Sequence, residues 1–178
     1  FTHDINPLKQ NANAASALAK NLGIKDEKIE KGLAEYKKPV HRLQIINHAS
    51  GAMILDDSYN SNPWAALSTL EYFNSMVKGE KIAVLGDMLE LGDFDESAHR
   101  ELGRHIAKSN FELVVGIGKS SKFLIEEVNM NSKNTKTYLF DNAISAVPLV
   151  KSKLDKGVDI LVKGSRSIGL DKLVDALL

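Results

Sequence analysis

Short apolar runs alternate with amphipathic stretches from Arg42 to the end of the chain. The runs have the length and the branched aliphatic content of buried strands. They predict strands at 81–85, 113–117, 138–140 and 159–162. Two further apolar runs, at 43–48 and 52–55, flank Ser50-Gly51 and predict a hairpin ahead of these strands.

The stretches between the runs have helical spacing. Asn62 followed by Pro63 is typical of a capped helix start. The apolar positions of that helix are expected on one face, at Leu67, Leu70, Phe73 and Val77. Further helices are expected at 97–107, at 119–128 and at 170–177. Another is expected after a cap at Asp141, and it bears Ile144, Val147 and Leu154. The alternation predicts an α/β fold with a Rossmann-like, mostly parallel sheet and helices on both of its faces.

Two short helices precede this pattern. Residues 11–22 are rich in alanine and end at Gly23, which suits a helix C-cap. Residues 26–36 place Ile29, Leu33 and Tyr36 at helical spacing, and Pro39 interrupts the pattern. Two such helices are too little to form a domain alone. The expected organisation is therefore a helical tail of another domain at 1–41 and an α/β domain at 42–178.

Composition narrows the function classes. The 178 residues carry 23 basic and 23 acidic side chains, and this balance argues against a dedicated nucleic-acid binder. The absence of cysteine excludes disulfides, thiolate catalysis and cysteine-based zinc sites. No apolar run suits a signal peptide or a membrane span, so we expect a cytoplasmic protein without membrane partners. The chain starts without Met, so we also expect a fragment or a processed form.

Polar residues gather where the predicted strands end, which is where α/β sheets bind ligands. Asp57 could accept hydrogen bonds from a ribose diol, and Tyr59 and Asn60 could contact an adenine. Plain turn chemistry also explains this stretch, because Asp, Ser and Asn favour turns and caps.

A second polar cluster, Lys163-Gly164-Ser165-Arg166-Ser167, follows the last predicted strand. Its cations and hydroxyl groups suit a phosphate or a carboxylate, although the pattern is not a Walker A loop. A solvated loop with a serine N-cap explains it equally well.

Two glycine-containing segments complete the candidates. Residues 86–92 could form a mobile active-site loop or a plain surface loop. Gly116-Ile117-Gly118 lacks the full dinucleotide fingerprint. The histidines do not form a metal-binding pair, and we predict surface or structural roles for them and no metal ligand in this chain.

Several of these motifs occur together, in an order typical of one protein family. They are Asn11-Ala12-Asn13-Ala14-Ala15, His41-Arg42, the run from Asp56 to Asn62, the run from Gly86 to Gly92, His99, and the run from Val162 to Ser167. With them the chain resembles the C-terminal portion of the Mur ligases, and in particular their MurF branch. One difference is Pro7-Leu8, which stands where that branch usually has His-Asn.

The resemblance implies an activity. The MurF branch uses ATP and magnesium to join UDP-N-acetylmuramoyl-tripeptide to D-alanyl-D-alanine. The tripeptide carboxylate is phosphorylated to an acyl phosphate, which the dipeptide amine then attacks. The magnesium ligands and the phosphate loop of the family lie on a central domain outside this chain. The fragment alone is therefore expected to be inactive, and the complete enzyme is expected to be a monomer.

The resemblance also implies roles for individual residues. Asp57 would bind the ATP ribose, and Tyr59 and Asn60 would lie near the adenosine. Asn11 would approach the adenine, and Arg42 would reach toward the phosphates. The residues implied for the dipeptide pocket are Lys163, Ser165, Arg166 and Ser167.

Two alternatives stay open. One is another Mur ligase or a folylpolyglutamate-type ligase, although the turn Tyr59-Asn60-Ser61-Asn62 favours the MurF branch. The other is a non-catalytic nucleotide- or protein-binding module of flavodoxin-like shape.

Overall fold

The computed structural model describes residues 6–178. The chain divides between Pro39 and Val40 into two compact units, each described here by itself. We call them the helical unit (6–39) and the sheet unit (40–178).

The helical unit consists of α1 (Pro7–Asn21) and α2 (Asp26–Ala34). Helix α1 starts four residues before the predicted position, because the Asn6 side chain accepts a hydrogen bond from the Leu8 amide and Pro7 occupies the first turn. Gly23 follows α1 with a φ of +76°, as expected for a helix C-cap. Neither helix contains a fully buried residue.

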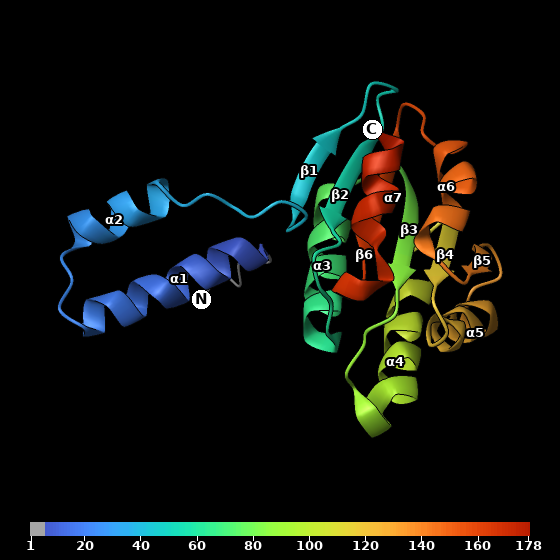
Figure 1. Ribbon diagram of the computed structural model, residues 1–178, viewed down its shortest axis with the longest axis horizontal. Helices are drawn as coiled ribbons and strands as arrows, with labels where there is room; N and C mark the ends of the chain where they lie inside the picture. Colours follow the sequence, from blue (N-terminus) through green and yellow to red (C-terminus); the bar gives the residue numbers. More distant parts are fainter. Residues whose placement is uncertain (1–5) are drawn as a thin grey trace. The chain divides into compact units, whose positions relative to one another are not determined.

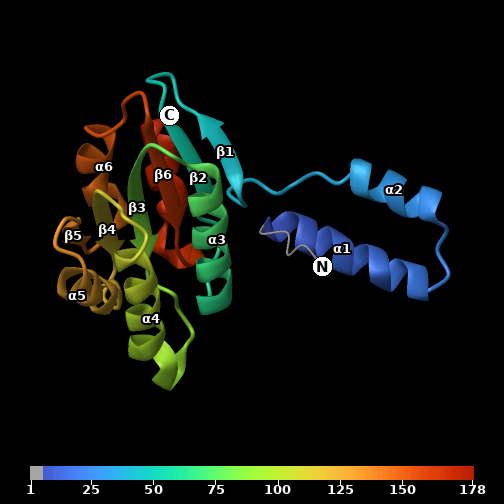
Figure 2. The same cartoon turned by 180° about the vertical axis from the view of Figure 1, so that it is seen from behind.

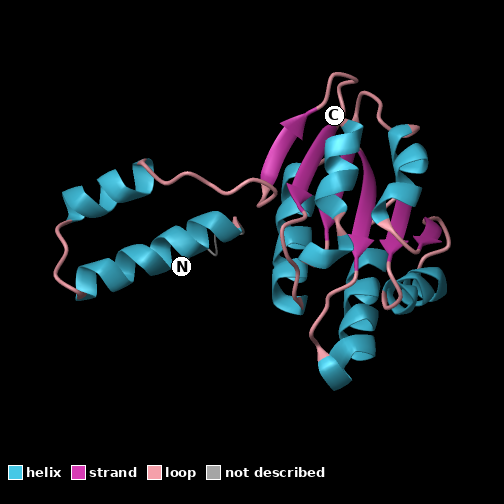
Figure 3. Ribbon diagram, viewed as in Figure 1, coloured by secondary structure: helices cyan, strands magenta, loops and turns pink. Residues whose placement is uncertain are grey.

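The sheet unit contains a six-stranded sheet with the strand order β1-β2-β6-β3-β4-β5. Only the pair β1–β2 is antiparallel, and every other neighbouring pair is parallel. The strands, drawn as arrows in Figures 1 and 3, are β1 (Gln44–Asn47), β2 (Met53–Asp57), β3 (Glu80–Gly86), β4 (Leu113–Ile117), β5 (Lys136–Phe140) and β6 (Val158–Lys163). The predicted α/β class and the mostly parallel sheet are confirmed.

Helices cover both faces of this sheet. Their bounds are α3 (Pro63–Met76), α4 (Asp95–Ala107), α5 (Ser121–Asn131), α6 (Ala143–Lys151) and α7 (Leu170–Leu177). Helices α6 and α7 lie on one side of the sheet and α3, α4 and α5 on the other, as the opposite views of Figures 1 and 2 show. Short 3₁₀ turns at Gly92–Phe94 and Arg166–Ile168 precede α4 and α7.

The core follows the alternation of side chains along the strands. On β6, Ile160 and Val162 belong to the apolar cluster that α6 and α7 complete, and Leu161, which is also buried, points to the opposite face. Because both faces are covered, the central strands are apolar at almost every position, which explains their continuous hydrophobic runs.

The start of α6 differs from the prediction. Asn142, rather than Asp141, is the N-cap, and its side-chain oxygen accepts a hydrogen bond from the Ser145 amide. The fully buried residues of α6 are Ala143, Ala146 and Val150. Of the apolar positions named from the sequence, Val147 and Leu154 are partly buried against the core, whereas Ile144 is 55% exposed.

The described helices include none with both the length and the apolar character needed to cross a bilayer.

Candidate functional site

The carboxyl ends of β2, β6 and β3 meet at one edge of the sheet, because these strands are adjacent and parallel. The turn after β2, the loop after β3 and the loop after β6 together form a cleft of about 620 Å³. Its lining residues are Tyr59, Asn60, Ser61, Asn62, Leu89, Glu90, Leu91, Ser165, Arg166 and Ser167.

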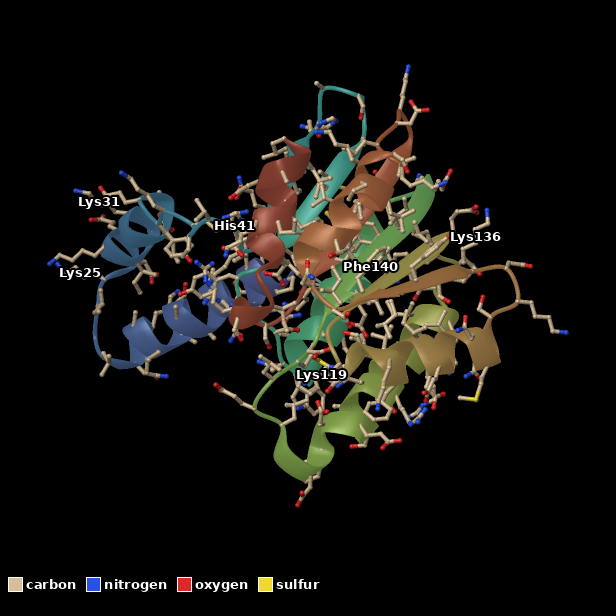
Figure 4. All side chains as sticks on the ribbon, turned by 45° about the vertical axis from the view of Figure 1, so that its right-hand side comes forward. Lys25, Lys31, His41, Lys119, Lys136 and Phe140 are labelled. Carbon is tan, nitrogen blue, oxygen red and sulfur yellow. The ribbon has the colours of Figure 1, made fainter. Side chains whose placement is uncertain are left out.

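The turn after β2 is organised by the buried carboxylate of Asp56. Its Oδ1 accepts hydrogen bonds from the Ser58 amide at 3.0 Å and from the Ser58 hydroxyl at 2.6 Å. Its Oδ2 lies 2.7 Å from Nδ1 of His41, a residue labelled in Figure 4. The local bonds of Asp56 therefore shape the turn, and its bond to His41 fastens the segment before β1 to that turn.

The segment His41–Leu43 has an unusual backbone. His41 and Leu43 have φ angles of +59° and +46°, which L-residues with side chains rarely adopt. Two hydrogen bonds hold the segment against the β2 turn: the Tyr59 amide donates to the His41 carbonyl, and the Leu43 amide donates to Asp57 Oδ1. The segment that carries Arg42 is thereby tied to the edge of the cleft.

Asp57 and Lys163 form a buried ion pair across the neighbouring strands β2 and β6. Lys163 Nζ lies 2.6 Å from Asp57 Oδ2 and also donates to the Asn60 carbonyl at 3.0 Å. The same Asp57 oxygen accepts a hydrogen bond from the Thr69 hydroxyl. The Lys163 side chain is only 3% exposed. Lys163 therefore holds the β2 turn in place rather than presenting a free charge to a ligand.

Ser165 likewise bonds within the protein. Its hydroxyl accepts a hydrogen bond from the Leu89 amide at 2.9 Å, and its amide donates to the Asp87 carbonyl. Ser165 is buried and links the loop after β6 to the loop after β3.

The loop after β3 is fixed by His99 of α4, which is fully buried. The Met88 amide lies 3.0 Å from His99 Nε2, and the Asp95 carbonyl lies 2.8 Å from Nδ1. A backbone amide can only donate, so Nε2 is the acceptor and Nδ1 carries the hydrogen. His99 thus orients the loop, which is a structural role of the kind predicted for the histidines.

Asp87 anchors the beginning of the same loop. Its Oδ1 accepts hydrogen bonds from the amide and the hydroxyl of Ser121, at the start of α5. Gly118 allows this approach, because a Cβ atom there would lie 2.4 Å from the Asp87 carboxyl group and the φ of +112° suits only glycine. The glycine pair Gly116 and Gly118 therefore has a packing role.

The accessible part of the site centres on Tyr59. The Arg42 guanidinium lies 4.1 Å from the centre of the Tyr59 ring, and that of Arg166 lies 5.2 Å from it. Both distances fall in the range of cation–π attraction. Arg42, Asn60, Arg166 and Ser167 are exposed, so their polar groups are available to a ligand.

The structure brings most of the predicted site residues together and divides them into two groups. Asp57, Lys163 and Ser165 are buried and bonded to the protein, whereas Tyr59, Asn60, Arg166 and Ser167 line the cleft and can be reached. Asn11 is an exposed residue of α1, in the helical unit, and is not part of this lining.

Within residues 6–178, no group of three or more His, Asp or Glu side chains is arranged to hold a metal ion. Among the residues that line the cleft, Glu90 is the only carboxylate. Mg²⁺ is usually held by one or two carboxylates together with substrate phosphates. The described residues do not supply such a set and therefore do not fit a magnesium site of their own.

The chain is similar to known proteins along most of its length. The family model for the glutamate ligase domain of Mur ligases matches residues 41–166, which include every residue that lines the cleft except Ser167. The UDP-N-acetylmuramoyl-tripeptide–D-alanyl-D-alanine ligase of Bacillus subtilis is 34% identical over 169 residues, covering 94% of the chain and 37% of the relative.

Solved structures of MurF proteins are also similar to this chain. MurF from Acinetobacter baumannii superposes with a TM-score of 0.79 at 31% identity, over 94% of the chain and 36% of that protein. MurF from Thermotoga maritima, solved in complex with ADP, shares the fold with a TM-score of 0.70 at 24% identity, over 90% of the chain and 35% of that protein.

The chain thus spans little more than a third of the length of these relatives and corresponds to their C-terminal portion. The matched family model covers well over half of the chain. The chain belongs to the Mur ligase family, through its glutamate ligase domain.

Proposed function

We propose that this chain acts as the C-terminal portion of an ATP-dependent ligase that joins D-alanyl-D-alanine to UDP-N-acetylmuramoyl-tripeptide. The observation that carries the proposal is the convergence of the β2 turn and the β3 and β6 loops on one cleft with accessible polar groups. The names of relatives that match along almost the whole chain support the choice of substrates.

In this proposal the nucleotide contacts the turn after β2. Tyr59 and Asn60 would lie near the adenosine, and Arg42 would face the phosphates. Asp57 already accepts three hydrogen bonds, so at most one acceptor position of its carboxylate would serve the ribose. Asn11 would approach the adenine from the helical unit. The ADP complex of the Thermotoga maritima relative agrees with nucleotide binding in this family.

The dipeptide would occupy the part of the cleft beside the β6 loop. Arg166 and Ser167 are the accessible donors there, and a guanidinium can bind a carboxylate through two hydrogen bonds. Lys163 and Ser165 would support this pocket indirectly, because their polar groups hold the β2 turn and the β3 loop.

The chemistry follows from the substrates. The tripeptide carboxylate attacks the γ-phosphorus of ATP, which yields an acyl phosphate and ADP. The dipeptide amine then attacks the acyl carbon, phosphate leaves with the electrons of the broken C–O bond, and the nitrogen loses a proton. The residues of this chain would contribute by binding and orienting the dipeptide and the nucleotide, which raises their effective concentration. A magnesium ion used by the complete ligase would be held by residues outside those that the structure describes.

The proposed domain organisation assigns residues 1–41 to a central ATP-binding domain. The apolar surface of the described helices supports it, since Leu18, Leu22 and Tyr36 are each more than 60% exposed. Side chains of this kind usually pack against further protein. We also propose that the complete ligase works as a cytoplasmic monomer.

The test is a complete ligase in which this chain replaces the matched region of the Bacillus subtilis relative. We expect phosphate release that requires ATP, the tripeptide precursor and D-alanyl-D-alanine together. The unaltered relative serves as the positive control, and an Arg166→Ala chimera should show a raised KM for the dipeptide. A chimera that folds and binds ATP but releases no phosphate would contradict the proposal and favour a non-catalytic module.

A further inference from the structure

Two of the residues that line the cleft are charged, and their charges are opposite. Glu90 belongs to the loop after β3, and Arg166 belongs to the loop after β6. The remaining lining residues are neutral, with hydroxyl, amide or apolar side chains. A cleft with one cation and one anion on different loops suits a ligand that carries both charges at its two ends.

Glu90 is held in an unfavourable backbone conformation. Its φ of +65° lies in the left-handed region, which residues other than Gly, Asn and Asp rarely adopt. The amides of the two preceding residues are bonded to other elements, Met88 to His99 and Leu89 to Ser165. The loop is therefore fixed on the approach to Glu90, and the surrounding structure maintains the strain. Strain of this kind is concentrated at functional sites.

The charges of both side chains are available to a ligand. Glu90 is exposed, and no hydrogen bond or ion pair of its carboxylate occurs within residues 6–178. Arg166 is 57% exposed and has one ion pair, between Nη1 and Asp171 at 3.2 Å. Its Nε and Nη2 groups keep donors for a second acceptor, because a guanidinium has five N–H groups.

We propose that Glu90 binds the ammonium group of the incoming zwitterionic dipeptide while Arg166 binds its carboxylate. The inference rests on the proposed function, and it adds a specificity-determining residue to it. Glu90 excludes dipeptides with a blocked amine, and it orients the nitrogen that becomes the new amide. Ser167 and Asn60 contribute a hydroxyl and an amide group to the lining of the same cleft.

The direct test measures binding by the chain itself, without ATP and without the other domains. The ¹⁵N-labelled chain is titrated with D-alanyl-D-alanine, with its N-acetyl derivative and with its C-terminal amide, and the amide signals of Asn60, Glu90 and Ser167 are followed. A lost charge-assisted hydrogen bond weakens binding about tenfold or more. We expect such a loss with either blocked dipeptide.

The variant Glu90→Gln keeps the size of the side chain and removes its charge. It should bind the free and the N-acetylated dipeptide equally well, and it should still discriminate against the C-terminal amide. Asp93→Asn is the matched control, since it removes a charge close by that does not line the cleft, and its preference should equal that of the unaltered chain. An undiminished preference of Glu90→Gln for the free amine, or no saturable shift with any dipeptide, overturns the inference.

Kinetics of the chimeric ligase separate this inference from the proposed function. There, Glu90→Gln should raise the KM for D-alanyl-D-alanine about tenfold and leave the KM for ATP unchanged. If the chimera is inactive while the chain still distinguishes free from blocked dipeptides through Glu90, the ligase assignment fails and the zwitterion site stands. If the chimera is active and Glu90→Gln leaves the KM for D-alanyl-D-alanine unchanged, the ligase assignment stands and the role of Glu90 is refuted.

Discussion

Lys163 Nζ and Asp57 Oδ2 lie 2.6 Å apart and join the ends of two neighbouring strands that are 106 residues apart in sequence. Both side chains are almost completely buried. The pair neutralises a cation and an anion that each look like ligand-binding groups from sequence alone. It also positions Asn60, whose carbonyl accepts a second hydrogen bond from Lys163. The polar groups that a ligand can reach are therefore those of the exposed residues around this pair, such as Asn60 and Arg166.

Removal of one partner of this pair should destabilise the sheet unit strongly. Asp57→Ala leaves the buried Lys163 ammonium without its counter-charge, and such losses cost about 3–5 kcal/mol. Urea unfolding followed by circular dichroism measures the change. The double variant Asp57→Asn/Lys163→Met should recover part of the loss, because it leaves no buried unpaired charge. A loss in Asp57→Ala below about 1 kcal/mol, the range of exposed ion pairs, would contradict a structural role.

His99→Leu should loosen the loop after β3. Leucine has a similar size but no acceptor atom. The variant therefore leaves the buried Met88 amide without a hydrogen-bond acceptor, which costs about 1–3 kcal/mol. Hydrogen exchange measured by NMR should become faster at the amides of Met88 and Leu89. His105→Leu is the control on the same helix, where the exposed imidazole pairs with Glu101, and it should leave that exchange unchanged. Unchanged exchange in His99→Leu would exclude a positioning role.

Glu90→Gly should stabilise the chain and weaken dipeptide binding at the same time. Glycine adopts a φ of +65° without strain, so the variant should gain about 0.5–1 kcal/mol of unfolding free energy. Thermal unfolding measures the gain, and the NMR titration measures the loss of preference for the free amine. Asn110→Gly, at a φ of +54° outside the cleft, should change the stability without any effect on binding. Lower stability of Glu90→Gly would show that the loop is not strained.

Asp159 gives the sheet unit a dependence of stability on pH. Burial raises the pKa of its carboxyl group above the ordinary value of 3.8, against a smaller opposing effect of the hydrogen bond from the Gly79 backbone. The folded chain therefore holds this proton more tightly than the unfolded chain. Stability contributed by the protonated form is lost as the pH rises from 3.8 through the raised pKa, and it changes no further above that pKa.

The variant Asp159→Asn tests this dependence. It keeps an oxygen for the Gly79 amide and has no ionisable group, so it should be as stable as the unaltered chain or more stable at pH 7. Unfolding free energies measured by urea denaturation between pH 3 and pH 7 should lose the corresponding slope. The exposed Asp141→Asn serves as the control and should retain it. A slope that persists in Asp159→Asn would assign the dependence to another group.

Much of the fold follows from local pattern in the sequence. Apolar runs of strand length between amphipathic helices are sufficient to predict the α/β class and a mostly parallel sheet, and Asn62-Pro63 marks the start of α3 correctly. Boundaries were less accurate where two adjacent residues could both cap a helix. Asp141 and Asn142 are such a pair, and in the structure Asn142 caps the helix.

The position of the candidate site, although not the role of each residue, could also be predicted from the sequence. The ends of parallel strands lie at one edge of a sheet, so the polar residues after β2, β3 and β6 could be expected near one another. Their individual roles could not be assigned in this way. Whether Lys163 is a free cation depends on the adjacency of β2 and β6, and strand order is a property of the whole chain.

The sequence by itself therefore determined the element types, the polar strand ends and the motifs that place the chain among the Mur ligases. Only the tertiary structure decided which of those polar groups bond within the protein, as Asp57 and Lys163 do. It also decided which of them remain accessible to a ligand, as Arg166 and Glu90 do. The physical reason is that capping and periodicity act within a few residues. Pairing, burial and backbone strain depend on contacts between segments that are distant in sequence.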